Sequence, residues 1–195
     1  MTASFAHGTA IPERLTDRGH ALLGVVLRPG DRALDGTCGN GHDCLFLARA
    51  VGPAGSVVAI DTQAIALERS ALRLLEAGVR ERVQLVLGDH GDLPRHLAGQ
   101  FLRAAIFNLG YLPGGTREHT TSAQSTVRAL EHTLDALVPG GRVVVVAYTG
   151  HPGGRAEAAA VLGAARAFVK AGRANWVERR GRPGPRTPRL LCMAR

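Results

Sequence analysis

Short apolar runs alternate with segments of helical periodicity along almost the whole chain, and this alternation limits the possible folds more than any other feature. Strands are indicated at residues 32–35, 56–61, 83–89, 103–109 and 142–148, with helices at 12–27, 44–51, 63–77, 122–138 and 155–170. Strands separated by helices build a parallel sheet that is covered on both faces. Two last strands, 175–180 and 189–195, enclose the loop "GRPGPRTP" and are predicted to pair antiparallel. We therefore predict an α/β fold with a seven-stranded, mostly parallel sheet and a C-terminal antiparallel hairpin.

Composition is consistent with one folded domain. The 195 residues are 45% hydrophobic and contain no linker or repeat, so we predict a single domain over 1–195. Within it, residues 1–28 form an N-terminal helical segment and residues 172–195 a basic hairpin. The three cysteines form no CxxC pair, which favours a reducing compartment over a disulfide framework or a zinc site. No apolar stretch has the length of a signal peptide or a membrane span, so a soluble cytoplasmic protein is expected.

The formal net charge of +8 indicates an anionic partner. Such an excess favours nucleic acid, because each phosphate contact releases counterions. Arginines that simply occupy solvated positions explain the charge equally well. The C-terminal third supplies a basic cluster around Trp176, which consists of Arg173, Arg179, Arg180, Arg182, Arg186 and Arg189.

A glycine-rich loop, "DGTCGNGHD", follows the first predicted strand and leads directly into a helix. Glycines at 36, 39 and 41 let the backbone approach a ligand at the helix N-terminus, although a plain tight turn is an alternative. Their spacing is not that of the dinucleotide-binding GxGxxG motif. Asp35 and Asp43 flank the loop, where they would repel a pyrophosphate and attract a sulfonium or ammonium. The loop therefore favours S-adenosylmethionine over NAD.

Aspartates also end the second and third predicted strands. Asp61 can accept hydrogen bonds from ribose hydroxyls, Gln63 can close over the adenine or sugar, and Asp89 or His90 can meet the adenine edge. Each aspartate alone could be a helix cap, but three successive strands that end in Asp favour one shared ligand. The predicted cofactor-binding residues are Asp35, Thr37, Gly39, Asn40, Gly41, Asp43, Asp61, Gln63, Asp89, His90 and Asn108.

The fourth predicted strand ends in "NLGYLPGG", which places Asn108 and Tyr111 at the spacing of the "NPPY" motif of amino methyltransferases. An amine acceptor needs hydrogen-bond acceptors that aim its lone pair at the methyl group, and the Asn108 side-chain oxygen and the Leu109 carbonyl are suited to this. Tyr111 could pack against the acceptor. The alternative is that Asn108 caps a turn and Tyr111 only packs.

Five blocks resemble, in the same order, a bacterial family described as rRNA methylase-like. They are "DGTCGNGHDCLFLA", "IDTQAI", "IFNLGYLPGG", "TT" at 120–121 and "VVAYTGHPGG", and together they span about 27–154. The resemblance implies a Rossmann-like class I methyltransferase fold, bound S-adenosylmethionine and a homodimer. It further implies transfer of a methyl group to the primary amine of 5-aminomethyl-2-thiouridine at the wobble position, in the anticodon region of tRNA.

The chain departs from the family at two places. Thr149 stands where the family usually has a histidine, and Asp89 stands before His90 where a serine is common. His151 is then the candidate base for the amine, beside Asn108 and Tyr111 as orienting residues; no metal is expected. The predicted substrate-binding residues are Leu109, Gly110, Pro113, Gly114, Arg117, Tyr148 and Thr149. Two alternatives stay open: methylation of ribosomal RNA or a small amine on the same scaffold, and a non-catalytic nucleic-acid-binding module.

Overall fold

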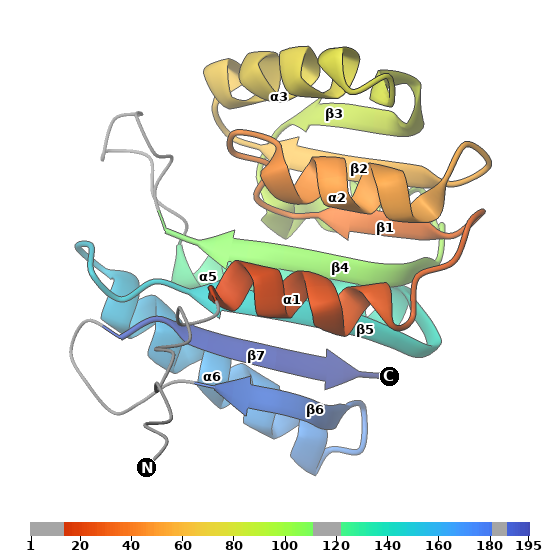
Figure 1. The fold of residues 1–195 in the computed structure, drawn as a ribbon. Coiled ribbons are helices and arrows are strands. Elements are labelled where there is room, and N and C mark those ends of the chain that lie inside the picture. Colours follow the sequence, from red (N-terminus) through yellow and green to blue (C-terminus); the bar gives the residue numbers. More distant parts are fainter. Residues whose placement is uncertain (1–13, 111–121, 181–186) are drawn as a thin grey trace, which may run out of the picture.

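The computed structural model describes residues 14–110, 122–180 and 187–195. One seven-stranded sheet runs through these residues in the order β3-β2-β1-β4-β5-β7-β6 (Figure 1). Its strands are β1 Arg32–Asp35, β2 Ser56–Asp61, β3 Val83–Leu87, β4 Leu102–Leu109, β5 Leu137–Ala147, β6 Asn175–Arg180 and β7 Arg189–Ala194. The helices are α1 Leu15–Gly24, α2 His42–Val51, α3 Ala64–Glu76, α4 Leu93–Leu97, α5 Ala123–Ala136 and α6 Gly154–Lys170, with short 3-10 turns at Arg80–Arg82 and His90–Asp92.

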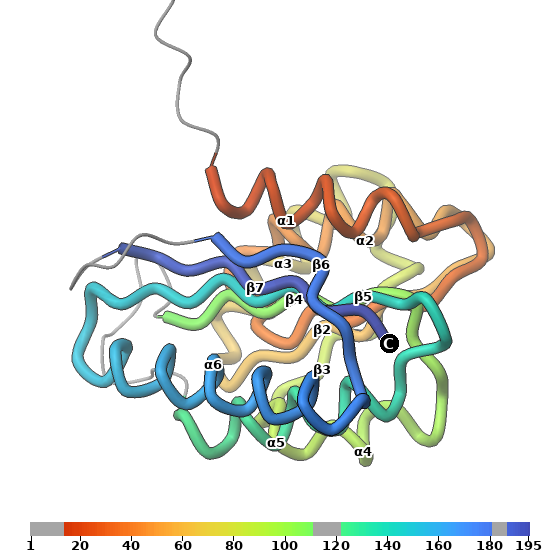
Figure 2. The backbone as a smooth tube through the Cα atoms, turned by 90° about the horizontal axis from the view of Figure 1, so that it is seen from below, coloured from red at the N-terminus to blue at the C-terminus, as the bar shows by residue number. Residues whose placement is uncertain are grey.

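The sheet confirms the predicted fold class. Strands β1 to β5 are parallel to one another, whereas β7 pairs antiparallel with both β5 and β6. Helices α1, α2 and α3 cover one face and α4, α5 and α6 cover the other (Figure 2). Each face has its own apolar core, because strands buried on both sides place alternate side chains on opposite faces. Phe107 of β4, for example, packs on the α5 side and Ile106 on the α1 side.

The chain reverses its direction across the sheet at β1. From β1 it proceeds outward to β2 and β3, then returns to place β4 on the other side of β1. Ligands of open α/β sheets bind beside such a reversal, at the carboxyl ends of the strands. This topology therefore brings the segments that follow Asp35 and Leu109 to one place.

The start of β5 differs from the sequence-based expectation. The sequence predicts that "PGG" at 139–141 separates a helix from the strand, but β5 already begins at Leu137. Leu137 pairs with Leu102, and the register then jumps so that Arg142 pairs with Ala104. Gly140, with φ 76°, takes up the extra residues as an irregularity within the strand.

Helix α1 precedes the first strand and is held against the sheet by polar and apolar contacts. Arg18 forms a salt bridge with Glu178 of β6, and the Leu22 carbonyl accepts a hydrogen bond from Arg142 of β5 at 2.8 Å. Leu22 and Leu23 are buried against the same face as α2. No helix in the described ranges has the length and apolar character that crossing a bilayer requires.

Candidate active site

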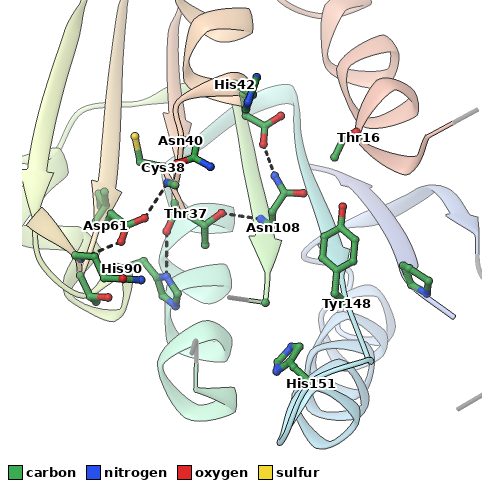
Figure 3. Close-up of a pocket in the computed structure, with 18 of the residues that line it drawn as sticks. Thr16, Thr37, Cys38, Asn40, His42, Asp61, His90, Asn108, Tyr148 and His151 are labelled. Atoms are coloured by element: carbon green, nitrogen blue, oxygen red, sulfur yellow. Dashed lines mark hydrogen bonds between the residues drawn. The ribbon is translucent and has the colours of Figure 1, made fainter. Parts of the chain in front are cut away.

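A cavity of about 1030 Å³ lies at the carboxyl ends of the parallel strands. Small-molecule sites usually measure about 300–1,000 Å³, so this cavity has room for a cofactor together with part of an acceptor. Figure 3 shows Thr37, Asp61, Asn108, Tyr148 and His151 around it. The predicted residues that line it are Thr37, Gly39, Asn40, Asp43, Asp61, Gln63, Asp89, His90, Asn108, Gly110, Tyr148, Thr149 and His151.

The glycine loop is held close to the sheet by packing and by backbone hydrogen bonds. A Cβ added to Gly36 would lie 2.1 Å from Cε1 of Phe107, so this position excludes any side chain. Gly41 caps α2 with φ 76°, a left-handed conformation that glycine adopts without strain. The Cys38 backbone N–H donates to the Ile60 carbonyl at 2.8 Å, which ties the loop to the end of β2.

Asp61 organises the loop on the cavity's β2 side. One carboxylate oxygen accepts from the Gly39 N–H at 2.8 Å and the other from the Gln63 N–H at 2.9 Å. Each oxygen keeps a second lone pair, so Asp61 remains able to accept from a ligand hydroxyl on the cavity side. The predicted ribose contact is therefore compatible with these bonds.

Asp89 and His90 form the wall nearest α5. Burial opposes ionisation of Asp89, but hydrogen bonds from the Ser125 hydroxyl and the Gly91 N–H outweigh it and lower the pKa of the carboxyl. Burial lowers the pKa of His90, which favours the neutral imidazole. His90 Nδ1 lies 3.0 Å from the Gly36 carbonyl and donates to it, so a neutral ring leaves Nε2 unprotonated.

Asn108 is fixed at the end of β4 by two contacts. Its backbone N–H donates to Thr37 Oγ1 at 2.7 Å, and its side-chain Nδ2 donates to Asp43 Oδ2. Its Oδ1 is buried and has no hydrogen-bond partner among the described residues. A buried acceptor without a donor costs free energy, which a donor on a bound ligand would remove. Asn108 points into the cavity beside Tyr148 in Figure 3.

The segment after β5 forms the opposite side of the cavity. Burial, with a contribution from the negative charge of Asp43, raises the pKa of the Tyr148 phenol. Thr149, in the place of the expected histidine, is buried and donates to the Thr187 carbonyl at 3.3 Å. His151 Nδ1 lies 3.0 Å from the Pro152 carbonyl, and the ring borders the cavity near Tyr148 (Figure 3).

Three predicted site residues lie behind the wall. The Leu109 side chain is fully buried, and its carbonyl accepts from the Tyr148 N–H at 3.0 Å because β4 and β5 remain paired here. The carbonyl oxygen keeps a second lone pair, so its predicted hydrogen bond with the acceptor stays a prediction. Gly41 packs against Ser70. Asp35 is fully buried, accepts from the Thr37 N–H at 3.1 Å through Oδ1, and leaves Oδ2 unpaired among the described residues. This burial raises the pKa of Asp35 well above its usual range.

Several predicted residues fall outside the described part of the chain. They are Tyr111, Pro113, Gly114 and Arg117 of the loop after β4, and Arg182 and Arg186 of the C-terminal hairpin. Their assigned roles stay predictions. Among the described arginines, Arg173 is engaged by Glu131 at 3.0 Å and Asp135 at 2.8 Å, and Arg179 lies over the Trp176 ring at 5.0 Å.

Sequence reasoning missed the contribution of α1. Arg14, Leu15, Thr16, Asp17 and His20 all line the cavity, as does Ser125 of α5. His20 Nε2 lies 2.5 Å from Asp43 Oδ1 and its ring stacks on Phe46 with centroids 4.1 Å apart. No local motif marks these residues, because their placement depends on how α1 packs across the sheet. The one indication in the sequence is His20, a polar residue close to the apolar Leu22 and Leu23 on the predicted first helix.

One cluster has side chains of the type that bind metal ions. Asp35, Cys38 and Cys44 are buried, and their ligand atoms lie within 4.8 Å of one another. The Cys38 thiol donates to Ser70 Oγ at 3.1 Å, so it already has a partner. The sequence spacing of the two cysteines gave no indication that they meet, since the loop between them folds back on itself.

Residues 57–193 match the family model described as "Putative rRNA methylase", and residues 14–93 match that of protein-L-isoaspartate(D-aspartate) O-methyltransferase. The tRNA (mnm(5)s(2)U34)-methyltransferase of Arabidopsis thaliana chloroplasts is 36% identical over 154 residues, which cover 74% of this chain and 56% of that protein. The chain spans about half the length, or less, of the first curated relatives that it matches.

Two solved structures are similar over nearly their whole length. One, from Clostridium thermocellum, carries the same rRNA-methylase description; it has a TM-score of 0.87 and 29% identity, over 95% of this chain and 99% of that one. The other is a Streptococcus mutans protein in complex with SAH, with a TM-score of 0.78 and 31% identity over 94% and 99%.

Proposed function

The chain belongs to the rRNA methylase family of methyltransferases, and from this premise we propose that it methylates the primary amine of 5-aminomethyl-2-thiouridine at the tRNA wobble position. S-adenosylmethionine is the methyl donor in this proposal. The Arabidopsis relative, whose name specifies a modified U34 of tRNA, supports the choice of substrate. The Streptococcus mutans protein in complex with SAH supports the choice of donor.

The proposal rests on one observation, the buried side-chain oxygen Oδ1 of Asn108. It is an acceptor at the cavity wall without a donor among the described residues, and Asp43 holds the amide so that Nδ2 cannot take its place. An amine with one N–H directed at Oδ1 has its lone pair turned elsewhere, toward a donor methyl group in the cavity. Alignment of this kind is the main requirement of a transfer from a sulfonium, which is already electrophilic.

The residues of the cavity fit S-adenosylmethionine. The wall carries Asp17, Asp43, Asp61 and Asp89, and these carboxylates favour a ligand with cationic groups. In this proposal Asp61 accepts hydrogen bonds from the ribose hydroxyls, and the glycine loop allows close approach of the backbone. When bound, the cofactor supplies the electrophilic methyl group. Asp61 and the loop orient it, while Asn108 orients the acceptor.

The acceptor must lose a proton before it attacks. An alkyl amine such as that of lysine has a pKa of about 10, so it reaches the cavity mostly as an ammonium ion. Desolvation in the cavity lowers this pKa, whereas the carboxylates of the wall raise it, so the reaction needs a group that accepts the proton. His151 and Tyr148 both line the cavity. His151 remains the proposed proton acceptor, and Tyr148 is proposed to contact the substrate.

The assay that tests the proposal uses tRNA from cells in which this gene has been deleted. We expect labelled S-adenosylmethionine to transfer its methyl group to this tRNA, and nucleoside mass spectrometry to place the methyl on 5-aminomethyl-2-thiouridine. Asn108→Ala should lower the rate about 100-fold or more, because orientation of the reacting groups is lost. Its dissociation constant for S-adenosylmethionine should change far less.

Asn175→Ala is the matched control. Asn175 is an exposed asparagine at the start of β6, at the opposite end of the sheet from the cavity (Figure 1), and its replacement should leave transfer unchanged. Binding of S-adenosylmethionine without transfer to tRNA would refute the tRNA assignment and direct the same assay to ribosomal RNA or small amines. Absence of any cofactor binding would favour the non-catalytic nucleic-acid-binding module. Assembly as a homodimer stays a prediction.

A further inference from the structure

Helix α1 places His20 against the N-terminus of α2. His20 Nε2 lies 2.5 Å from Asp43 Oδ1, and the imidazole stacks on Phe46 of α2 with an interplanar angle of 5°. Because an ionised carboxylate can only accept hydrogen bonds, Nε2 is protonated and donates a hydrogen bond to Asp43. The stack and the hydrogen bond together fix the plane and the direction of the ring.

Asp43 is bound on both of its oxygens by groups from different elements. Oδ1 accepts from His20 of α1 and Oδ2 accepts from the Nδ2 of Asn108 of β4. The side chain is largely buried, with 11% of its surface exposed. Two donors on opposite oxygens allow one orientation of the carboxylate, and loss of either donor would free it to rotate.

This orientation decides which end of the Asn108 amide faces the cavity. The carboxylate accepts only from Nδ2, so the amide is held with Oδ1 directed away from Asp43. If Asp43 rotated, the amide could turn over and present an N–H where the proposed acceptor needs a hydrogen-bond acceptor.

We propose that His20 is a positioning residue for methyl transfer, which acts through Asp43 to hold the Asn108 amide oxygen toward the acceptor amine. The identity of the acceptor as an amine rests on the proposed function. Helix α1 then contributes to the acceptor site, although it lies before residues 57–193, which match the family model. His20 should then affect the rate of transfer more than the binding of the cofactor.

The test compares His20→Gln with His20→Met. The two side chains have similar length and both remove the ring that stacks on Phe46, but only Gln retains an N–H donor for Asp43. We expect His20→Met to lower kcat about 10-fold or more, whereas His20→Gln keeps most of the activity. The S-adenosylmethionine dissociation constant should stay within about 2-fold in both variants. Equal rates for the two variants, whether both fast or both slow, would overturn the inference.

A second measurement does not depend on which substrate is methylated. The side-chain NH₂ signals of Asn108 can be assigned in a ¹⁵N spectrum by their loss in Asn108→Ala. They should shift in His20→Met and return toward the wild-type position in His20→Gln. Signals that stay unchanged in His20→Met would refute the coupling, even if transfer to tRNA is confirmed. If the wild type fails to methylate tRNA but the signals shift as expected, the proposed function fails and the coupling stands.

Discussion

Gly36→Ala should destabilise the protein strongly, for a reason that lies in packing alone. Gly36 is not among the residues with positive φ, so its backbone accepts a side chain without strain. An added Cβ would, however, lie 2.1, 2.4 and 2.8 Å from three carbons of the Phe107 ring. Carbon atoms normally pack at about 3.5–4.0 Å, so the ring must move by more than ~1 Å.

Phe107 lies in a densely packed part of the molecule. Its ring is fully buried in the α5-side core and packs edge-on against His90, with centroids 5.8 Å apart. Overpacking of a dense core costs about 1–3 kcal/mol or more, and the size of this overlap places Gly36→Ala at about 3 kcal/mol. For a chain of this length that corresponds to a melting temperature lower by about 6–12 °C.

Thermal and denaturant unfolding of four variants would measure this effect: Gly36→Ala, Gly163→Ala, Phe107→Leu and the double variant Gly36→Ala/Phe107→Leu. Gly163, an exposed glycine of α6 with no atom near its added Cβ, is the matched control. Gly163→Ala should stabilise by about 0.5–1 kcal/mol, because alanine favours the helix. In a Phe107→Leu background the cost of Gly36→Ala should fall, since part of the ring is gone. A loss below ~1 kcal/mol, or the same loss in both backgrounds, would refute the steric explanation.

Three further predictions concern pH and charge. Burial raises the pKa of Asp35, so ionisation of this carboxyl opposes folding increasingly as pH rises. Asp35→Asn should therefore stabilise the protein at neutral pH. Urea unfolding at several pH values should show this gain in stability shrinking toward pH 4. Burial lowers the pKa of His90, so the stability of the wild type should decrease as pH falls below about 6.5, and the pH dependence of the melting temperature should be weaker in His90→Gln. A hydrogen bond from Arg18 lowers the pKa of Glu178, so Glu178→Gln should lose about 0.5 kcal/mol above pH 4.5 after solvent screening is allowed for. High salt should reduce this difference from the wild type.

Much of the fold was predictable because it depends on short-range patterns. Runs such as 143–147 are apolar at every position, as expected for a strand that is buried on both faces. Once five parallel strands are assigned, their carboxyl ends must meet at one edge of the sheet. That geometry is why the sequence alone predicts one site for Asp61, Asp89 and Asn108, which are distant along the chain and all line the cavity.

The parts that sequence could not predict depend on long-range packing. Arg18 and Glu178 are 160 positions apart, and nothing in either neighbourhood indicates the other. The position of His20 follows from the crossing of α1 over β5 and β7, which depends on side chains of several strands. The irregular start of β5 likewise results from pairing with Leu102, which extends the strand through glycines that resemble a turn.

The chain is strongly basic, yet the cavity is lined by several aspartates. The net charge of +8 does not show how the charges are distributed: among the described residues, four aspartates line the cavity, while most of the arginines lie elsewhere. The proposed reaction requires both kinds of charge on the protein. Basic side chains outside the cavity would bind the phosphates of the tRNA, and carboxylates inside it would bind the cationic cofactor and the amine. Salt screens exposed charges more than buried ones, so raising ionic strength should weaken tRNA binding steeply and S-adenosylmethionine binding little. Equal salt sensitivity of the two ligands would contradict this division of the surface.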